Sequence, residues 1–421
     1  MTRAAPLAQT LRDAARIVAR VAGGRSLADE FGAYAGPARA ALIDLSHGTL
    51  RRYGRVQSLV GELARRGRPD VLVESLLWCA FYALESGRYA DYTVVDQAVR
   101  ACGLLERWSA KGFVNGLLRS YLRERASLES RIAAVPEARY QHPAWWIALV
   151  REAYPEAWQE ILVAGNSHPP MTLRVNRRRA SVEAYEGMLA AAGMAAQRTG
   201  MATLLLAQPV PVDRLPGFAE GLVSVQDAGA QRAAHCLDLS PGQRVLDACA
   251  APGGKTAHIL ELADVSLTAL DLDPDRVARI HATLARLGLS ADVRAADAAA
   301  LATWWDARPF ERILLDVPCS SSGVARRHPD LKWLRRAGDV PAFAERQSRL
   351  LSSLWQALAV GGKLLYVTCS VFPGENEAVV TGFASRTPGA KVLALPDGAP
   401  AQMLPGPTHD GFYYALLTKQ A

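Results

Sequence analysis

The sequence has few cysteines, and none of them lie at the spacing of a common metal site. Six cysteines are spread over 421 residues, at positions 79, 102, 236, 249, 319 and 369, with no C-x-x-C pair among them. A small disulfide scaffold is therefore excluded, and a structural zinc site is not expected. We predict that the chain holds no metal and that any functional cysteine acts as a thiol.

Long apolar segments are also missing. The most apolar early stretch, residues 71–84, is interrupted by Glu74 and is shorter than the roughly 20 residues that span a bilayer. The N-terminal residues carry arginines at intervals and no continuous apolar segment, which is not typical of a secretory signal. These features, together with the unpaired cysteines, predict a cytoplasmic protein with no membrane partner.

A strong charge of one sign is absent as well. The chain has 48 Lys and Arg against 41 Asp and Glu, a net charge of +7, which permits an anionic partner without requiring one. Half of the residues are hydrophobic and 21% are charged, so extensive disorder is excluded. A chain of 421 residues is too long for one core, and we expect two or three domains.

Residues 1–134 show the apolar periodicity of helices and no strand-like alternation. One apolar stripe, with arginines on another face of the same helix, consists of Leu7, Leu11, Ala14, Val18 and Val21. We predict an all-α domain over residues 1–134. Cys79 and Cys102 fall on apolar helix faces and are expected to be small core residues.

Residues 135–220 differ in composition and predict a small α+β subdomain. Pro169 and Pro170 interrupt any helix, and a short strand is expected at residues 173–176. Four arginines occur within six residues: Arg174, Arg177, Arg178 and Arg179. Such a density suits contacts with RNA phosphates, although a solvated basic turn would have the same composition.

Residues 221–421 alternate between strands and helices. Short apolar runs that end in an acidic or reactive side chain occur at residues 244–247, 267–271, 293–297, 312–316 and 363–369. Helices are expected between most of them, clearly at residues 275–287 and 342–360. This order predicts a doubly wound, mostly parallel sheet, which binds ligands at the carboxyl ends of its strands.

The loop after the first of these strands predicts a nucleotide-like cofactor. Residues 247–256 read DACAAPGGKT, and two adjacent glycines allow a tight turn and close approach to a ligand. A Walker A loop would need glycine where Cys249 stands, and the G-x-G-x-x-G fingerprint is absent. Asp271 is placed to bind a ribose diol and Asp297 to meet an adenine amino group. This set predicts S-adenosyl-L-methionine.

Two thiols end the strands where a substrate would lie. Asp316 is followed by Val-Pro-Cys319, and the last strand ends in Thr-Cys369. A thiolate that adds to C6 of a pyrimidine makes C5 nucleophilic enough to accept a methyl group. An acid such as Asp316 would hydrogen-bond the ring, and a second thiol could assist loss of the C5 proton. The spacing does not decide which cysteine attacks.

Several motifs together resemble the Sun/Nop2 family of RNA cytosine-5 methyltransferases, most closely its bacterial Sun-type branch. The motifs are DACAAPGGKT, DLDPDR, DVPCSSSGVARRHPDLKW and TCSVFPGENE. The resemblance covers essentially the whole chain. It implies a Rossmann-like methyltransferase domain over residues 221–421, preceded by a NusB-like RNA-binding domain and a small RNA-binding α+β subdomain. It also implies methylation of C5 of a cytosine in 16S ribosomal RNA.

The resemblance also implies a role for each matched residue. The cofactor loop would comprise Cys249, Ala250, Ala251, Pro252, Gly253, Gly254 and Lys255. Asp271 would hold the ribose, Asp297 the adenine side, and Asp316 would face both cofactor and cytosine. Cys369 would be the nucleophile, and Cys319 would help to release the product. Val317 stands where many relatives have alanine and removes no functional group.

The same resemblance predicts the partner. A second group of basic residues, expected beside the entering RNA, contains Arg326, Arg327, Lys332, Arg335 and Arg336. The target base should lie in a single-stranded or looped region, since it must leave its stack. Transfer RNA as substrate and a non-catalytic RNA-binding assembly factor are the alternatives; both thiols and all four strand-end acids argue against the latter. A monomer is expected.

Overall fold

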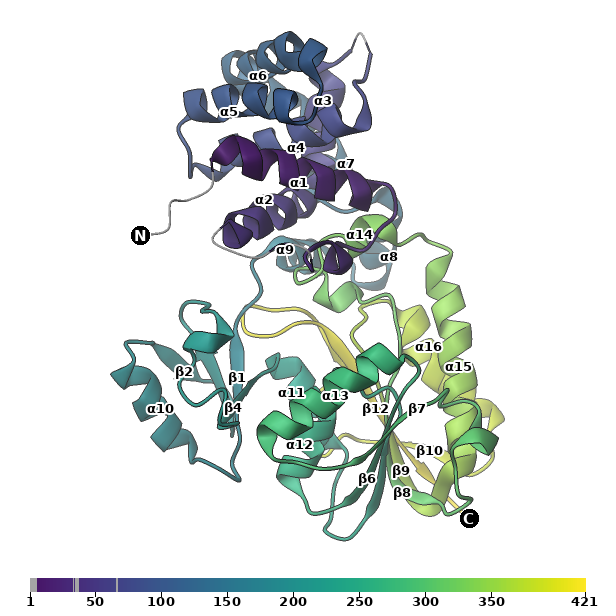
Figure 1. The fold of residues 1–421 in the computed structure, drawn as a ribbon. Coiled ribbons are helices and arrows are strands. Elements are labelled where there is room, and N and C mark those ends of the chain that lie inside the picture. Colours follow the sequence, from purple (N-terminus) through teal and green to yellow (C-terminus); the bar gives the residue numbers. More distant parts are fainter. Residues whose placement is uncertain (1–5, 33, 35–37, 66) are drawn as a thin grey trace. The chain divides into compact units, whose positions relative to one another are not determined.

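The computed structural model describes residues 6–32, 34, 38–65 and 67–421, which form two compact units. The N-terminal unit contains the described residues up to Ser167 together with a later segment, Ala325–Ala337. The C-terminal unit contains His168–Val324 and Gly338–Ala421 (Figure 1). The division of the chain at residues 134 and 220 into three domains remains a prediction.

The described part of the N-terminal unit is built from helices, which confirms the all-α prediction. Its α-helices are α1 (Leu7–Ala22), α2 (Arg39–Arg51), α3 (Tyr53–Leu63), α4 (Val71–Ser86), α5 (Asp91–Leu104), α6 (Lys111–Ile132), α7 (Pro136–Tyr140), α8 (Ala144–Ala153), α9 (Trp158–Asn166) and α14 (Leu331–Leu334). Two short 3-10 helices, η1 (Leu27–Glu30) and η2 (Trp108–Ala110), lie between them. Cys79 and Cys102 are fully buried, as expected.

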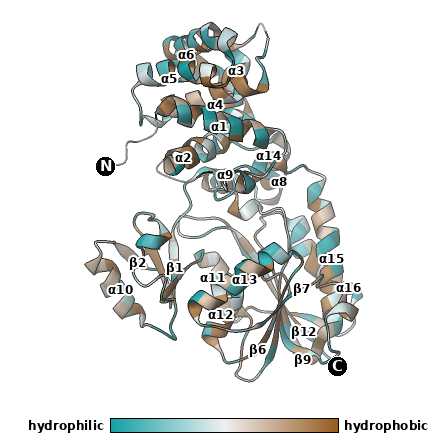
Figure 2. Ribbon diagram, viewed as in Figure 1, coloured by the Kyte–Doolittle hydropathy of each residue, from teal (hydrophilic) through white to brown (hydrophobic). Residues whose placement is uncertain are grey.

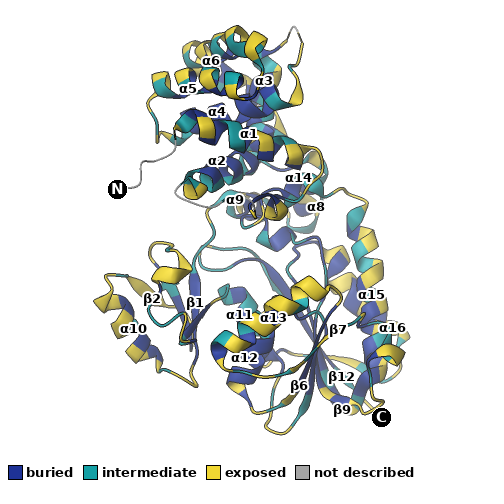
Figure 3. Cartoon of the chain, in the orientation of Figure 1, coloured by how far each residue is buried: buried dark blue, intermediate teal, exposed yellow. Residues whose placement is uncertain are grey.

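Helix α4 is the centre of this unit. Twelve consecutive residues, Val73 to Leu84, are buried, which is typical of a helix that is covered on all sides (Figures 2 and 3). Asp70 caps its N-terminus by accepting from the N–H of Leu72, and Gly87 ends it with φ of 65°. At 16 residues it is the most apolar helix of the unit, yet no helix in the described ranges is long and apolar enough to span a membrane.

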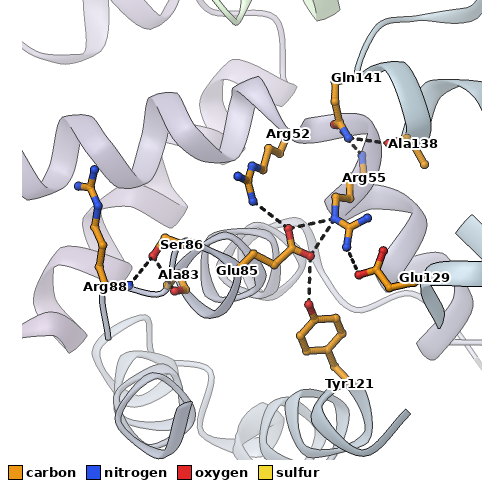
Figure 4. A network of polar contacts seen from close by, with 10 residues as sticks. All are labelled: Arg52, Arg55, Ala83, Glu85, Ser86, Arg88, Tyr121, Glu129, Ala138 and Gln141. Carbon is orange, nitrogen blue, oxygen red and sulfur yellow. Dashed lines mark hydrogen bonds and ion pairs between the residues drawn. The ribbon is translucent and has the colours of Figure 1, made fainter. Parts of the chain in front are cut away.

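A buried carboxylate joins three helices of the unit (Figure 4). The side chain of Glu85 on α4 is 4% exposed and accepts hydrogen bonds from Arg55 Nε on α3 at 2.8 Å and Tyr121 Oη on α6 at 3.1 Å. Arg52 adds a third contact at 3.2 Å, and Arg55 also pairs with Glu129 on α6. A buried carboxylate with this many donors holds α3, α4 and α6 in one arrangement.

The segment Ala325–Ala337 packs inside the N-terminal unit although it follows Cys319 in sequence. Lys332 is fully buried, and its Nζ donates to Gln141 O at 2.9 Å, Asn166 Oδ1 at 2.7 Å and Arg51 O at 3.2 Å. Arg326 is 2% exposed. The prediction that Arg326 and Lys332 flank the RNA is therefore wrong, because neither reaches solvent. Arg327, Arg335 and Arg336 keep that role only as a prediction.

The C-terminal unit begins with a small antiparallel sheet. Its elements are β1 (Thr172–Val175), α10 (Val182–Ala191), β2 (Ala196–Arg198), β3 (Thr203–Leu206), η3 (Val212–Arg214) and β4 (Val223–Val225), with the strand order β2-β3-β1-β4. The strand expected at residues 173–176 is β1, one residue earlier. Its apolar side chains Leu173 and Val175 pack with Tyr185 and Leu189 of α10. The mixed α+β character of this region is confirmed.

A seven-strand path with one added strand forms the second sheet. The strand order is β10-β12-β9-β8-β5-β6-β7, and β11 pairs with β12. The strands are β5 (Arg244–Asp247), β6 (Ser266–Asp271), β7 (Asp292–Ala295), β8 (Phe310–Asp316), β9 (Leu358–Thr368), β10 (Ala390–Leu393), β11 (Gln402–Met403) and β12 (Phe412–Lys419). From β9 to β7 all pairs are parallel, while β10, β11 and β12 pair antiparallel.

Helices cover both faces of this sheet, which confirms the doubly wound prediction (Figure 1). The helices are α11 (Ala228–Cys236), α12 (Gly254–Leu262), α13 (Pro274–Leu287), α15 (Asp339–Ala357) and α16 (Glu377–Arg386), with 3-10 helices η4 (Leu301–Thr303), η5 (Ser322–Val324) and η6 (Pro373–Glu375). One core contains α11–α13, and the other contains α15 and α16. The helix expected to end at residue 360 ends at Ala357, because β9 already begins at Leu358.

Replacing Lys332 by Met tests the structural role of its buried amino group. The three acceptors around Nζ would lose their donor, so we expect the free energy of unfolding to fall by about 2 kcal/mol or more. Urea unfolding followed by tryptophan fluorescence measures this change. Arg16→Met, at an exposed position on α1, is the control and should leave the unfolding midpoint unchanged. Equal midpoints for both variants would contradict the assignment.

Candidate active site

The carboxyl ends of the parallel strands open into one cavity of about 440 Å³. Side chains from the ends of β6, β8 and β9 and from the loops after β5 and β7 line it. The predicted site residues among them are Cys249, Ala251, Asp271, Asp297, Asp316, Cys319 and Cys369. The volume is within the range of small-molecule sites. The fold thus brings together most of the residues that the sequence singled out, from five separate stretches of the chain.

The glycine loop turns tightly between β5 and α12. Gly253 has φ of 94°, and a Cβ added there would lie 3.1 Å from Ile280 Cα, so a side chain would be strained and crowded. Ala250 and Gly253 are buried, Pro252 is exposed, and Gly254 begins α12. Of the predicted loop residues, Cys249 and Ala251 line the cavity. Removal of its thiol from water and then the charge of Asp316 raise the pKa of Cys249.

Two carboxylates border the far side of the cavity. Asp271 is 3% exposed; its oxygens accept from the N–H groups of Ala251 and Asp273, each at 3.2 Å. Asp297 is exposed and accepts from Ala299 N at 2.9 Å, so it also caps its own turn. A carboxylate has about four lone-pair sites, which leaves both groups able to accept further hydrogen bonds from a ligand.

Asp316 forms an ion pair with a residue of the glycine loop. Lys255 Nζ lies 2.6 Å from Asp316 Oδ2, and both side chains are largely shielded from water. Desolvation alone would lower the pKa of Lys255, but the charge and hydrogen bond of Asp316, together with the charges of Cys369 and Asp247, leave the pKa raised. Lys255, expected along the cofactor, is thus positioned by the acid at the end of β8.

The two thiols lie in contact. Cys319 Sγ and Cys369 Sγ are 3.4 Å apart, and Cys369 Sγ also lies 3.6 Å from Ser321 Oγ. The shared hydrogen bond lowers the pKa of Cys369 and raises that of Cys319, because the proton stays on Cys319. Of the two sulfurs, Cys369 is therefore the one that becomes a thiolate first. Cys249 offers no comparable stabilisation.

A fourth strand-end acid, Asp247, does not line the cavity. It is fully buried at the end of β5, and its Oδ2 accepts from Thr256 Oγ1 at 2.7 Å. Burial raises its pKa to about 7, and the neighbouring charge of Asp316 adds to the rise. Lys255 and Thr256, which resemble the end of a Walker A loop, thus pair with two acids at strand ends: Lys255 with Asp316 and Thr256 with Asp247.

The arginine cluster at residues 174–179 is divided between interior and surface. Arg174 is 1% exposed and makes a bidentate ion pair with Glu261 on α12, with N–O distances of 2.8 and 2.9 Å. The prediction that Arg174 contacts RNA is wrong, since it is buried in this pairing. Arg177, Arg178 and Arg179 are exposed, and Arg178 pairs with Asp264 at 2.7 Å.

Other cavity residues had no signal in the sequence that separated them from a solvated helix face. Arg346 and Arg349 on α15 line the cavity, are exposed, and have no ion pair with any carboxylate in the described ranges. Arg276, at the start of α13, lies 3.4 Å from Asp271. The spacing of residues 346 and 349 places both on one side of a helix, but a solvated helix face shows the same spacing.

Models of three protein families match consecutive parts of the chain. The NusB family matches residues 14–123, and a ferredoxin-like domain of RsmF/B-like methyltransferases matches residues 142–213. The model described as 16S rRNA methyltransferase RsmB/F matches residues 234–418, which contain all the cavity residues named above. The order of these matches is the order of the domains expected from the sequence.

Curated proteins and solved structures show the same likeness over most of the chain. Ribosomal RNA small subunit methyltransferase B of Pseudomonas putida is 44% identical over 391 residues, 90% of each chain, and that of Vibrio cholerae is 42% identical over 390 residues. A methyltransferase homolog of Pyrococcus horikoshii has a TM-score of 0.60 at 26% identity, covering 68% of this chain and 97% of its own. The protein PH0851 shares the fold, with a TM-score of 0.81 over 98% of this chain and 99% of its own, at 24% identity.

Replacing Asp247 by Asn tests whether this acid is protonated when the protein is folded. Because its pKa is about 7 in the folded protein and 3.8 ordinarily, the folded state binds the extra proton between these values. The stability from this group is fully present below pH 4 and is lost as the pH rises to 7, by at most about 4 kcal/mol.

The measurement is urea unfolding of both proteins from pH 4 to pH 8. Wild type should lose stability relative to Asp247→Asn across that range, whereas the exposed control Asp213→Asn should follow wild type. A difference between wild type and Asp247→Asn that does not vary with pH would contradict the raised pKa.

Proposed function

Because the chain belongs to the RsmB/F family of 16S rRNA methyltransferases, we propose that it methylates C5 of a cytosine in 16S rRNA through a covalent adduct of Cys369 with C6. Methylation of ribosomal RNA with S-adenosyl-L-methionine follows from family membership. The position of the methyl group on C5 and the covalent adduct are supported by the two cavity thiols, whose sulfur atoms are 3.4 Å apart. C5 of cytosine is a weak nucleophile, and a thiol is the group that can activate it.

The cavity suits the cofactor in charge and shape. Asp271, Asp297 and Asp316 line it, and a cationic sulfonium is favoured near carboxylates. The tight turn at Gly253 lets the backbone of the loop come close to a ligand. Bound there, S-adenosyl-L-methionine supplies the methyl group that C5 accepts. Asp271 would hold the ribose and Asp297 the adenine side.

The two thiols divide the remaining chemistry between them. Cys369 Sγ, as a thiolate, forms a bond to C6, and the electron pair of the C5–C6 double bond moves to C5. Once C5 carries the methyl group, its proton must leave before the bond between C6 and Cys369 can break. Cys319, 3.4 Å from Cys369, would relay that proton: its sulfur accepts the proton from C5 while its own proton passes to the sulfur of Cys369 as the bond to C6 breaks. Elimination then restores the ring and both thiols.

Asp316 would bind the reacting ring. It lines the cavity with both thiols, and Lys255 holds its Oδ2 at 2.6 Å. A carboxylate at this place can accept a hydrogen bond from the exocyclic amine of cytosine or exchange a proton with N3 as charge develops there. Lys255 then supplies an opposite charge beside the carboxylate and fixes its position before substrate binds.

Two cysteine variants test the assignment of the thiols. With labelled cofactor and 16S rRNA from cells that lack the enzyme, wild type should transfer label to cytosine, mapped as 5-methylcytosine. Cys369→Ala should lose transfer to background, because no adduct can form. Cys319→Ala should instead accumulate an RNA–protein adduct that survives denaturing electrophoresis.

Cys236→Ala is the matched control, since Cys236 is a buried free cysteine that does not line the cavity. It should transfer label and leave no adduct. If wild type labels no ribosomal RNA, or if label appears on a position other than C5, the proposed chemistry is wrong. If Cys319→Ala turns over without an adduct, the division of labour between the thiols is wrong.

The exposed arginines at the cavity provide a candidate path for the RNA. Arg346 and Arg349 face the same cavity as the thiols, and each phosphate that an arginine neutralises contributes about 0.7 to the slope of log K against log salt for single strands. A double Gln variant at both positions should weaken RNA binding and, if each arginine neutralises one phosphate, reduce that slope by about 1.4. Filter binding at several salt concentrations measures it.

The control is a double Gln variant of Arg279 and Arg386, which are exposed but do not line the cavity. It should keep the slope of wild type, and both double variants should keep the affinity for S-adenosyl-L-methionine. A cavity variant that loses cofactor affinity while its salt slope is unchanged would assign these arginines to the cofactor instead of the RNA.

A further inference from the structure

A fully buried carboxylate lies beneath the two thiols. Glu375, in the 3-10 helix η6 after β9, has no exposed surface. Its Oε1 accepts from the backbone N–H of Ser320 at 2.7 Å and from Gln347 Nε2 at 3.2 Å. Its Oε2 accepts from Ser370 Oγ at 2.7 Å. Ser320 directly follows Cys319, and Ser370 directly follows Cys369, so one carboxylate holds both thiol-bearing loops.

The two loops are joined to each other at the same place. Ser370 Oγ lies 3.0 Å from Ser322 Oγ and 3.2 Å from Ser320 Oγ, and it accepts from the N–H of Phe372 at 3.0 Å. Gln347 on α15 donates from the same Nε2 to Pro318 O at 3.0 Å. The loop that carries Cys319 is thus anchored on both sides of the cysteine, and the anchors converge on Glu375.

Neutral groups donate the hydrogen bonds to this carboxylate. No ion pair joins Glu375 to any lysine or arginine in the part of the chain that is described, and its three donors are neutral groups. Burial of a charge costs several kcal/mol unless donors replace the lost water. A methionine or leucine would fill the same space without that cost. A charge that is kept at this cost should have a function, and its hydrogen bonds lead to the loops of the two cysteines.

We propose that Glu375 is a positioning residue for methyl transfer: it fixes the distance between Cys319 and Cys369 and keeps the shared proton of the pair on Cys319. The inference rests on the proposed function of the two thiols. The carboxylate is tied to Cys319 through one peptide unit, so negative charge on the sulfur of Cys319 would lie close to a second, fixed negative charge. Cys369 is left as the sulfur that ionises.

Other charged and titratable groups lie around the pair. Asp316 from the end of β8 and Lys255 from α12 face Cys369 as an ion pair of opposite charges. Tyr366 on β9 donates to the backbone oxygen of Glu375 at 2.6 Å, and Arg346 and Arg349 line the cavity. Among these, Glu375 alone hydrogen-bonds to both thiol loops, and its removal should therefore change the balance between the two cysteines.

Glu375→Gln removes the charge and keeps the shape. The reduced full-length protein, without RNA or cofactor, is alkylated briefly with iodoacetamide from pH 6 to pH 10, and peptide mass spectrometry gives the rate for each cysteine. In wild type we expect Cys369 to react first. In Glu375→Gln the ratio of the Cys369 rate to the Cys319 rate should fall by about tenfold, the effect of one pKa unit. Glu377→Gln, exposed two residues away, is the matched control and should match wild type.

A second variant addresses the distance between the sulfurs and remains useful if Glu375→Gln fails to fold. Ser370→Ala keeps the charge but removes the donor to Oε2. Diamide, which takes up two electrons and two protons as the two thiols form a disulfide, reports how readily the sulfurs meet. We expect Ser370→Ala to slow formation of the Cys319–Cys369 disulfide severalfold, and Glu377→Gln to leave it unchanged.

The outcomes separate this inference from the proposed function. If Glu375→Gln melts like wild type and keeps the wild-type ratio of thiol rates, the inference is wrong. If both cysteines of a variant react as fast as in urea, Glu375 is only structural, which also overturns it. Since these readouts need no RNA, they stand even if wild type methylates nothing. Where methylation occurs, Glu375→Gln should lower kcat and leave both KM values near those of wild type.

Discussion

The active cavity depends on the parallel pairing of β8 with β9. In that register Asp316 lies opposite Val367, so the two strands reach the same edge of the sheet together. Cys319 follows Asp316 by three residues and Cys369 follows Val367 by two, and both chains turn there. Two thiols 50 positions apart in sequence therefore meet at 3.4 Å. A shift of one residue in the register would turn one of the strand ends to the opposite face.

The second constraint is that each ionisable side chain buried away from water needs hydrogen-bond or ion-pair partners. Arg174 is matched by Glu261, Lys332 by three neutral acceptors, and Glu375 by three neutral donors. Asp247 has one donor, Thr256, and holds a raised pKa of about 7 instead. These groups lie beside or directly behind the cofactor loop, the thiol loops and the segment after them. Interior charge in this protein thus fixes loops around the cavity, in addition to joining packed helices as Glu85 does.

The sequence predicted the fold class, four of the five strand runs to within a few residues, and the convergence of acids and thiols at one edge, because these follow from short-range patterns and from the geometry of parallel sheets. It did not predict the contacts of charged side chains. Arg174 and Arg177 belong to one basic cluster in the sequence, yet Arg174 is buried and Arg177 is exposed. The difference arises from Glu261, 87 positions later. No local pattern contains that information.

The motif RRHPDLKW shows the same limit in a form that affects function. Its basic residues suggest an RNA surface, whereas Lys332 supplies three hydrogen bonds inside the N-terminal unit and Asp330 accepts from Leu27 N at 2.9 Å. The segment begins at Ala325, six residues after Cys319. Without the residues up to 167, this segment would lose these hydrogen-bond partners, and the side chain of Lys332 would be exposed to solvent. The partners of Asp330 and Lys332 therefore all belong to the N-terminal unit, and a basic motif that directly follows a thiol loop in sequence serves the packing of the helices instead of a surface for RNA.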